Sequence, residues 1–261
     1  MIKNAVSFAR YAKKRFPEGL SIMLVGSVSR GEQMPIWSDI DIVAYFHDRN
    51  ALTPEAIRRL RLCVMKSKGK EQMWIKVHTP DSFPDSLNTI TVINYRKDGK
   101  MLLGKDLKPL LKERMDAFTE KDIRDAVISR MINERFYFRY YYTGMDDKNM
   151  ELGCTHIESR KGKSRDMLSA QIIDRIIENC QNALYFRGIQ ATNKHDIVER
   201  FSMAFLDFKW KDVPIILYAI RKRWGRLSKK DYGYIFSDEP ILFMEGLTDL
   251  LVKGKGCGGL T

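Results

Sequence analysis

The first 115 residues alternate between helical and strand-like patterns of apolar residues. Apolar positions recur at helical spacing before Pro17, and Thr53-Pro54 is typical of a helix start, because threonine caps and proline fits the first helical position. Apolar runs bounded by turn residues indicate strands. The expected helices span 3–16 and 54–66, and the expected strands span 20–26, 39–46, 72–79 and 89–104, the last with a turn at 98–99. This mixture predicts a small α/β or α+β domain over residues 1–115.

From Thr119 onward the pattern is helical only. A T-x-x-D cap signal begins a long helix that meets no breaker before Gly144. Four further helices are expected over residues 166–188, 194–208, 213–225 and 239–254. The sequence therefore predicts an all-α bundle in residues 116–261, and its glycine-rich tail, 253–261, is expected to be flexible.

Composition and charge narrow the classes of partner. Of 261 residues, 44% are hydrophobic, which is enough for cores in two domains. The formal net charge of +12 favours anionic partners such as nucleic acid, nucleotides or acidic surfaces. The four cysteines lie far apart without C-x-x-C spacing, which argues against a disulfide framework or a zinc site. No signal-peptide pattern and no apolar stretch near about 20 residues is found, so we expect a cytoplasmic protein without membrane contact.

Two aspartates, Asp39 and Asp41, stand in an otherwise apolar strand. Because side chains alternate across a strand, both point to one face, about 7 Å apart along the backbone. Carboxylates this close repel each other unless a divalent cation lies between them, and aspartate oxygens suit magnesium that shares phosphate ligands. Gly26 and Ser27, at the end of the preceding strand, permit close approach of a ligand and provide donors for a phosphate. The sequence thus predicts phosphate donors beside a metal-holding pair of carboxylates.

This arrangement of a strand, Gly26-Ser27, eleven further residues and an Asp-x-Asp strand resembles the nucleotidyltransferase superfamily related to DNA polymerase beta. Within that superfamily, the resemblance is to the minimal and kanamycin nucleotidyltransferase type. Residues 98–104 also resemble the hairpin that follows the catalytic strands of such small members. The resemblance covers about residues 1–115 and implies the α+β class, with a small mixed sheet and flanking helices.

The resemblance also implies a reaction. A nucleoside triphosphate (NTP) would be the substrate, and its nucleoside monophosphate would move to a hydroxyl acceptor with release of pyrophosphate. Asp39 and Asp41 would hold magnesium (or manganese) ions. The residues near the phosphates would be Gly26, Ser27, Ser29 and Arg30.

The third carboxylate that is usual in this superfamily is missing here. It belongs on the next core strand, where Lys76 stands in its place. His78, on the same face of that strand, is a candidate general base or weak ligand, and a shifted register would bring in Glu71. Otherwise the domain binds nucleotide but transfers it slowly or not at all. Lys76 would then neutralise a phosphate or replace the charge of a metal.

Residues 119–252 resemble, more loosely, the HEPN-type helical bundles that accompany small nucleotidyltransferases. In kanamycin-type enzymes a similar helical domain helps to build the acceptor site. Some HEPN domains are metal-independent ribonucleases with an arginine and a histidine a few residues apart. Arg187 and His195 are too far apart for that pattern, which argues against ribonuclease activity.

Two basic stretches in the second half allow RNA contact but have simpler interpretations. In residues 135–142, Arg135 and Arg139 lie one helical turn apart among aromatic residues, where packing in a core or a homodimer interface is favoured over base stacking. Residues 221–230 carry six basic residues near a helix end. Such a run suits either a solvated face or a phosphate backbone.

Three functional hypotheses remain open at this stage. The first is a magnesium-dependent nucleotidyltransferase whose acceptor is a small molecule, a protein side chain or an RNA end, and the charge of +12 favours RNA over polycationic acceptors. The second is a degenerate nucleotide- or RNA-binding module, a sensor or an antitoxin-like partner, which Lys76 supports. The third, a generic α/β domain with Asp39 and Asp41 as turn and cap residues, leaves Gly26-Ser27 unexplained.

Overall fold

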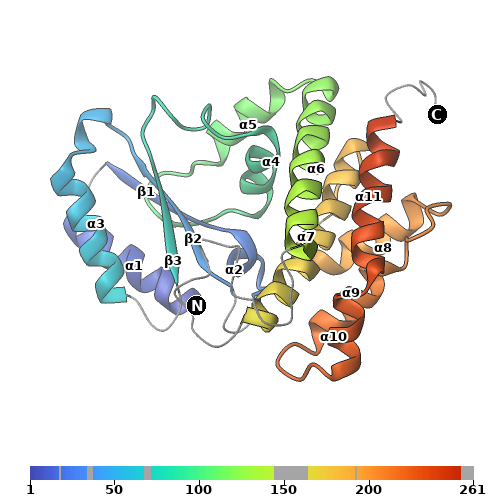
Figure 1. The fold of residues 1–261 in the computed structure, drawn as a ribbon. Coiled ribbons are helices and arrows are strands. Elements are labelled where there is room, and N and C mark those ends of the chain that lie inside the picture. Colours follow the sequence, from blue (N-terminus) through green and yellow to red (C-terminus); the bar gives the residue numbers. More distant parts are fainter. Residues whose placement is uncertain (18, 34–37, 68–71, 144–163, 192, 254–261) are drawn as a thin grey trace. The chain divides into compact units, whose positions relative to one another are not determined.

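The computed structural model describes residues 1–17, 19–33, 38–67, 72–143, 164–191 and 193–253 (Figure 1). The chain divides into two compact units, residues 1–119 (unit 1) and residues 120–261 (unit 2). No helix among the described residues has the length and apolar character needed to cross a membrane. The tail expected to be flexible lies, from residue 254 on, outside the described residues.

A four-stranded mixed sheet forms the centre of unit 1, with the strand order β3-β2-β1-β4. β1 pairs antiparallel with both β2 and β4, whereas β2 and β3 are parallel. The strands are β1 (Leu20–Val25), β2 (Ile40–Phe46), β3 (Met73–His78) and β4 (Lys100–Leu103). The expected α+β class, with a small mixed sheet and flanking helices, is therefore confirmed.

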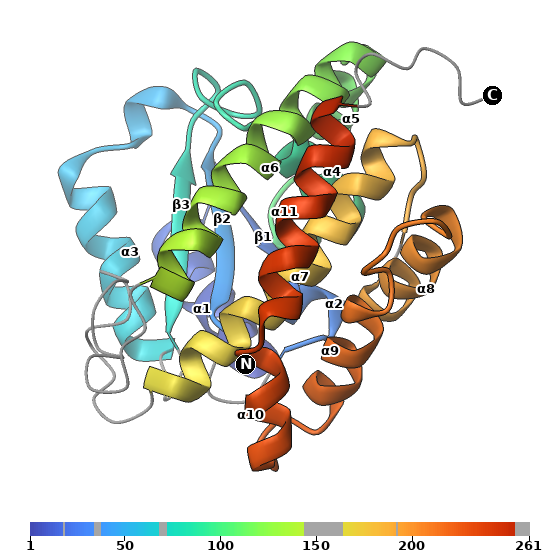
Figure 2. The ribbon, with the colours of Figure 1, turned by 45° about the vertical axis from the view of Figure 1, so that its right-hand side comes forward.

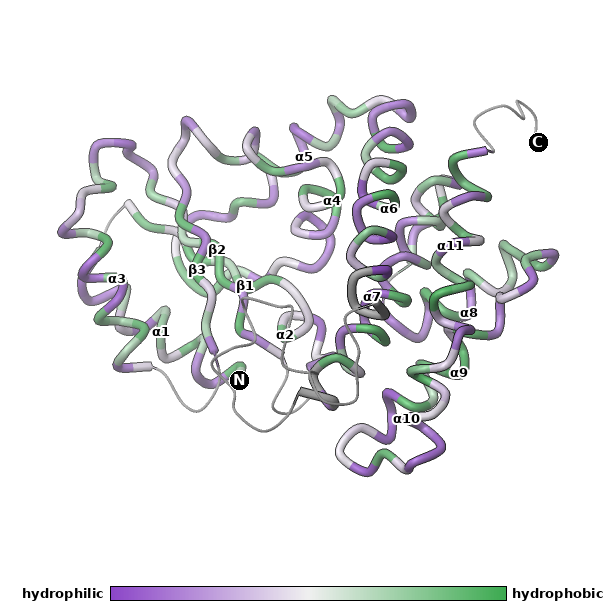
Figure 3. The backbone as a smooth tube through the Cα atoms, in the orientation of Figure 1, coloured by the Kyte–Doolittle hydropathy of each residue, from purple (hydrophilic) through white to green (hydrophobic). Residues whose placement is uncertain are grey.

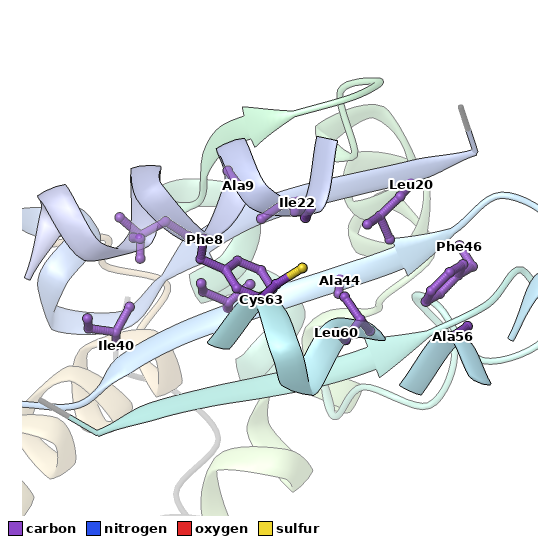
Figure 4. Packing of buried hydrophobic residues seen from close by; sticks show 14 of the residues in the cluster. Phe8, Ala9, Leu20, Ile22, Ile40, Ala44, Phe46, Ala56, Leu60 and Cys63 are labelled. Atoms are coloured by element: carbon purple, nitrogen blue, oxygen red, sulfur yellow. The ribbon is translucent and has the colours of Figure 1, made fainter. Parts of the chain in front are cut away.

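One face of this sheet is covered by α1 (Ile2–Arg15) and α3 (Pro54–Ser67). Phe8 of α1, Ala44 of β2 and Leu60 of α3 belong to one buried cluster (Figure 4). Their burial follows from the sequence, because the apolar positions of each helix recur on a single side and the even-numbered residues of β2 point toward them.

The opposite face is covered by α4 (Thr89–Asp98) and α5 (Lys108–Asp116). Val43 of β2, Tyr95 of α4 and Leu111 of α5 are buried together there. Alternation along β2 thus sends odd-numbered residues to this face. Asp41 shares the odd-numbered face, so the helices that cover it decide what surrounds the carboxylate.

Two short helices complete unit 1. α2 (Gly26–Arg30) follows β1 directly, and a 3-10 helix, η1 (Arg49–Ala51), precedes α3. The side chain of Asp48 accepts a hydrogen bond from the backbone N–H of Asn50 at 2.9 Å and so caps η1. The chain therefore turns sharply at the end of β1 and again after β2.

Residues 89–98 form the helix α4, so the strand expected there is wrong. The side chain of Asn88 accepts a hydrogen bond from the N–H of Thr91 at 2.9 Å and caps the first turn. Gly99 follows the helix, and only residues 100–103 form a strand, which pairs with β1. The hairpin expected over 98–104 is therefore not formed.

The expected boundary between residues 115 and 116 falls inside α5, which belongs to unit 1. Leu111 is fully buried in the unit 1 cluster, and Met115 and Phe118 pack against it. Arg114 also lies over the ring of Phe118, 5.2 Å from its centroid. These contacts extend unit 1 to Thr119.

Unit 2 consists of helices over its described residues. α6 (Glu120–Thr143), α7 (Ser164–Phe186), α8 (Lys194–Ala204), α9 (Val213–Lys222), α10 (Lys229–Ile235) and α11 (Asp238–Lys253) follow one another along the chain. The five helices expected from the sequence are present, and α10 is one that the sequence analysis missed.

The helix α7 is the centre of unit 2, because it contacts α6, α8, α9, α10 and α11. Its apolar residues Ile172, Ile173, Ile176 and Ile177 are at most 1% exposed. α6 and α11 also lie side by side, as Figure 2 shows. Apolar and polar residues alternate along the turns of the helices, which is the pattern that permits one-sided burial (Figure 3).

Ion pairs also connect the helices of unit 2. Asp174 of α7 accepts hydrogen bonds from Lys194 of α8 and from Arg221 of α9, the second at 3.0 Å between Arg221 Nε and Asp174 Oδ1. Lys194 is only 5% exposed, so its ammonium requires such a partner. These contacts fix α8 and α9 against α7.

Candidate active site at the start of strand β2

Gly26 and Asp41 approach each other closely where β1 ends. Val25 pairs with Asp41 in the register of β1 and β2, and Gly26 comes next in the chain. Gly26 has a φ of +75°, which favours glycine, and a Cβ built on it would lie 2.8 Å from Oδ2 of Asp41. A larger residue at this position would therefore displace the carboxylate.

Asp39 lies one residue before β2 and is held by an aromatic side chain of β3. The indole Nε1 of Trp74 donates a hydrogen bond to Oδ2 of Asp39 at 3.2 Å. Trp74 pairs with Asp41 in the parallel register and is 42% exposed. Trp74 was not among the site residues expected from the sequence. The signal for it was its position on the strand that follows the Asp-x-Asp strand, on the face of Lys76.

Lys76 lies two residues after Trp74 on β3, on the face of the sheet that Asp41 shares, and its side chain reaches Asp41. Its Nζ lies 3.9 Å from Oδ1 of Asp41 and donates a hydrogen bond to the hydroxyl of Tyr95 at 2.8 Å. Burial favours the neutral amine of Lys76, but Tyr95 and the charge of Asp41 outweigh it and raise the pKa of Lys76 above its ordinary value. Lys76 is therefore a cation at neutral pH, beside the position expected for a third carboxylate.

His78 lies farther along β3 and is not brought to the carboxylates. It pairs with Tyr45, four residues beyond the pair of Asp41 and Trp74, a separation of about 13 Å along the strand. Its ring contacts Phe83, and its buried Nε2 has no hydrogen-bond partner within the described chain. Burial and then Lys76 lower the pKa of His78. The geometry thus separates His78 from the site that the sequence analysis assigned to it.

The residues of α2 divide into two groups. The side chain of Ser27 is half-buried, and Val25, the residue before the helix, has no side chain that could cap the first N–H groups. Ser29 is fully buried, and its hydroxyl donates to the carbonyl of Gly26 at 2.7 Å. Ser29 therefore stabilises the turn rather than facing a ligand.

Arg30 is engaged by two carboxylates. Its Nε donates to Glu32 at 2.6 Å and its Nη1 donates to Asp98 at 2.9 Å. Asp98 is the last residue of α4, so Arg30 connects α2 to the helix that carries Tyr95. These bonds use two of the five N–H donors of the guanidinium, so the contact with phosphates expected of Arg30 stays a prediction.

The carboxylates of Asp39 and Asp41 fit a magnesium ion by their chemistry. Magnesium prefers hard oxygen ligands and binds through one or two carboxylates, with water and substrate phosphates as its other ligands. Among the described residues, no three His, Cys, Asp or Glu side chains gather into a metal site. Glu71, the alternative third carboxylate, lies outside the described residues. The structure thus offers two acidic ligands and leaves the remaining positions to water and substrate.

The basic and aromatic stretches of unit 2 are largely engaged within that unit. Arg135 pairs with Asp249 at 2.9 Å, and Arg139 pairs with Glu245 at 2.5 Å, so both arginines attach α6 to α11. Of the aromatic residues around them, Phe138 is fully buried. The pairing of both arginines and the burial of Phe138 support the structural interpretation for these three residues, whereas Phe136 and Tyr137 are exposed.

The second basic stretch is also partly paired. Arg221 binds Asp174, and Nη2 of Arg223 donates to Oδ1 of Asp231 at 2.5 Å. The Nζ of Lys222 lies 4.8 Å from the ring centroid of Tyr218. RNA contact through residues 221–230 therefore stays a prediction with fewer available cations than the sequence suggested.

Comparisons with known proteins concern the family and the fold of the chain. A family model described as a nucleotidyltransferase domain matches residues 7–138, which include Gly26, Asp39, Asp41 and Lys76. The structure is similar to that of spectinomycin adenyltransferase AAD(9) from Enterococcus faecialis, solved with ATP and spectinomycin. The TM-score is 0.58 at 11% identity, over 97% of this chain and 99% of that chain. At this identity the likeness shows a shared fold.

No curated protein sequence matches the chain. The comparisons do not address the HEPN-like character of unit 2, which stays a prediction.

Proposed function

The chain belongs to the nucleotidyltransferase domain family, and from that premise we propose that it transfers a nucleoside monophosphate from an NTP to a hydroxyl acceptor, with magnesium or manganese. The observation that carries the proposal is the contact between Gly26 and Asp41. Through this contact, the turn expected to bind phosphate lies against Asp41, one of the two carboxylates expected to hold the metal.

In this proposal Asp39 and Asp41 hold the ion, and the N–H groups at Gly26 and Ser27 bind phosphate oxygens. Trp74 fixes the orientation of Asp39 through its indole N–H. A bound magnesium ion would supply charge neutralisation for the phosphates and polarise the α-phosphate. Lys76 contributes positive charge on the same face.

The proposed reaction is an in-line displacement at the α-phosphorus. The acceptor hydroxyl oxygen forms a bond to that phosphorus while the bond to the bridging oxygen breaks, and pyrophosphate leaves with the electron pair. In this proposal the hydroxyl proton passes to solvent, because His78, the base expected from the sequence, lies about 13 Å from Asp41 along β3. A slow reaction is therefore expected unless the acceptor itself is acidic.

Lys76 favours a second candidate function, a nucleotide-binding module with little or no transfer. A cation 3.9 Å from Oδ1 of Asp41 neutralises part of the charge that would otherwise attract metal. The same fold would then act as a sensor of nucleotide or as a partner of another protein. The two functions share the binding step and differ in pyrophosphate release.

The decisive experiment measures both steps with the full chain. The purified protein is mixed with each labelled ribonucleoside triphosphate, magnesium or manganese, and an extract of small molecules and RNA. Pyrophosphate release and label transfer are followed, together with metal-dependent nucleotide binding. Small molecules belong in the extract because the structural neighbour was solved with spectinomycin, and RNA belongs there because of the net charge of +12.

We expect release and transfer in the unchanged protein and their loss in Asp39→Asn and Asp41→Asn. Asp116→Asn is the matched control, because Asp116 is an exposed carboxylate of the same unit that pairs only locally with Lys112. Binding without release would favour the binding module. Binding that survives both Asn substitutions would overturn the metal role of the pair.

A further inference from the structure

Lys76 is held in one place beside the carboxylates. Its ammonium donates to the hydroxyl of Tyr95 at 2.8 Å and lies 5.5 Å from the centroid of that ring. A lysine side chain has four rotatable carbon–carbon bonds and is usually mobile when exposed. The contact with α4 therefore fixes a positive charge 3.9 Å from Oδ1 of Asp41.

The register of the sheet determines which side of the carboxylates this charge occupies. Lys76 pairs with Val43 across β2 and β3, so its side chain leaves the sheet on the odd-numbered face that Asp41 shares. Trp74 occupies the position opposite Asp41 itself and holds Asp39. The carboxylate of Asp41 therefore lies close to Gly26, which follows β1, and to the ammonium of Lys76 on β3.

We infer that the ammonium of Lys76 is a built-in cation of the nucleotide site, which takes the place of a second divalent ion, so that the site binds one divalent ion per nucleotide. The inference rests on the proposed function for the nucleotide and the first ion. It assigns to Lys76 the task of contributing a fixed charge to the triphosphate at a position where a carboxylate would hold a second ion.

Charge balance supports this assignment. Asp39 and Asp41 carry two negative charges, which one divalent ion neutralises. A second divalent ion on the side of Asp41 that faces β3 would meet the Lys76 ammonium, and the described residues provide no third acidic or histidine ligand to hold it. The triphosphate adds negative charge that an ammonium can match without requiring a ligand shell.

The test counts bound ions directly. Manganese binding to the full chain is measured by electron paramagnetic resonance at saturating non-hydrolysable NTP analogue, and again without nucleotide. The unchanged protein is compared with Lys76→Glu, which supplies a third carboxylate, and with Lys76→Met, which keeps an apolar side chain of similar length without the charge. Circular dichroism confirms that each variant is folded.

We expect one manganese ion per chain in the unchanged protein and in Lys76→Met, and two in Lys76→Glu. Without nucleotide, Lys76→Met should bind its ion about tenfold more tightly, the effect of removing one unit charge about 6 Å from a divalent ion in a water-like dielectric. Two ions in the unchanged protein, no second ion in folded Lys76→Glu, or unchanged affinity in Lys76→Met would each overturn the inference.

These outcomes are distinguishable from failure of the proposed function. If no variant binds manganese in a nucleotide-dependent way, the nucleotide site itself is wrong and the inference is overturned with it. If two ions bind to the unchanged protein and pyrophosphate is released, the proposed function stands and only the role of Lys76 is wrong.

Discussion

At the scale of single residues, the candidate site depends on the absence of a side chain at Gly26. A Cβ at Gly26 would lie only 2.8 Å from Oδ2 of Asp41, which is too close for the two atoms to coexist without a shift. Two physical requirements therefore coincide at one residue, a positive φ and room for a neighbouring carboxylate. A substitution at Gly26 tests the site without removing any candidate ligand.

We expect Gly26→Ala to weaken metal-dependent nucleotide binding by about tenfold or more, because the new Cβ would displace a carboxylate that the ion requires. The positive φ should also cost about 1 kcal/mol of folding stability. Nucleotide titration in magnesium and urea unfolding would measure the two effects separately.

Gly31→Ala is the matched control for that substitution. Gly31 has a φ of +76°, nearly the same as Gly26, but a Cβ built on it meets nothing within 4 Å. It should lose similar stability and keep its nucleotide affinity. Equal loss of affinity in both variants would show that strain in α2, rather than the contact with Asp41, is responsible.

The residues of the candidate site differ in how well the sequence predicted them. The position of Lys76 on the face of Asp41 follows from strand alternation and from the pairing of neighbouring strands, whereas the shared face of Asp39 and Asp41 stays a prediction. The environments of Ser29 and Arg30 depend on how the five-residue α2 turns and on Asp98 of α4. Such contacts come from tertiary packing, which local patterns do not contain.

At the scale of elements, α4 shows why the secondary structure was only partly predictable. All residues from 89 to 93 are β-branched, and none of them is a strong helix former, which favoured a strand. In the structure Ile90 is buried, Val92 and Tyr95 are buried against the sheet, and Asn88 caps the helix. Asn88, a typical helix-capping residue, was therefore the signal in the sequence that pointed to a helix against the strand propensity of the β-branched residues.

The short helix α10 depends on its first turn. The backbone N–H of Asp231 donates to the hydroxyl oxygen of Ser228 at 3.2 Å, and the carboxylate of Asp231 accepts from the backbone N–H of Ser228 at 2.8 Å, which forms a capping box. The same carboxylate also accepts hydrogen bonds from the Ser228 hydroxyl and from Arg223. The bond from the Ser228 backbone, then the Ser228 hydroxyl and Arg223, lower the pKa of Asp231 to about 2 from its ordinary value of 3.8. The lowered pKa means that the folded state prefers the ionised carboxyl.

We expect Asp231→Asn to lower the free energy of unfolding by about 1–2 kcal/mol at neutral pH. Because the folded pKa is depressed, this contribution is complete above about pH 4 and is lost as the pH falls toward 2. The difference between the unchanged protein and the variant, measured by urea unfolding at several pH values, should therefore shrink below pH 4.

Asp238→Asn serves as the control for Asp231→Asn. Asp238 also lies in the first turn of a helix, α11, and is exposed. It shares the favourable position near a helix N-terminus but lacks the capping box that is present at α10. An equal change of stability in both variants would assign the effect to the helix dipole rather than to the hydrogen bonds of Asp231.

At the scale of the whole molecule, the change from mixed to purely helical patterning located the two units but not the residue at which they divide. Periodicity identifies the longer helices, whereas unit membership depends on which core a helix packs against. Leu111 of α5 is buried in the cluster of unit 1, and this could not be read from the local pattern of residues 108–116.

The net charge of +12 does not show which cations are available to an anion. Arg135 and Arg139 are paired with acidic residues of α11, and Arg221 and Arg223 are paired with Asp174 and Asp231. Sequence counts charges but does not show which are neutralised inside the fold. Among the described residues, the charges at the candidate site include Asp39, Asp41 and Lys76.

We expect a fragment of residues 1–119 to be more stable than one of residues 1–115 by about 1–3 kcal/mol, because the shorter fragment lacks the side chain of Phe118. Phe118 packs on the cluster of unit 1 and lies against Arg114, 5.2 Å from the guanidinium carbon to the ring centroid. Urea unfolding of both fragments, followed by far-ultraviolet circular dichroism, would measure the difference.

Phe118→Ala in the longer fragment should reproduce most of that loss, whereas Phe118→Leu should keep most of the stability, because leucine retains apolar contact with the cluster. Equal stability of the two fragments would place the end of unit 1 before Phe118. If residues 1–119 do not fold at all, the compact unit requires the rest of the chain, and α5 does not complete its core. Folding of residues 1–119 would in turn allow nucleotide binding to be tested on the unit that carries Gly26, Asp39, Asp41 and Lys76.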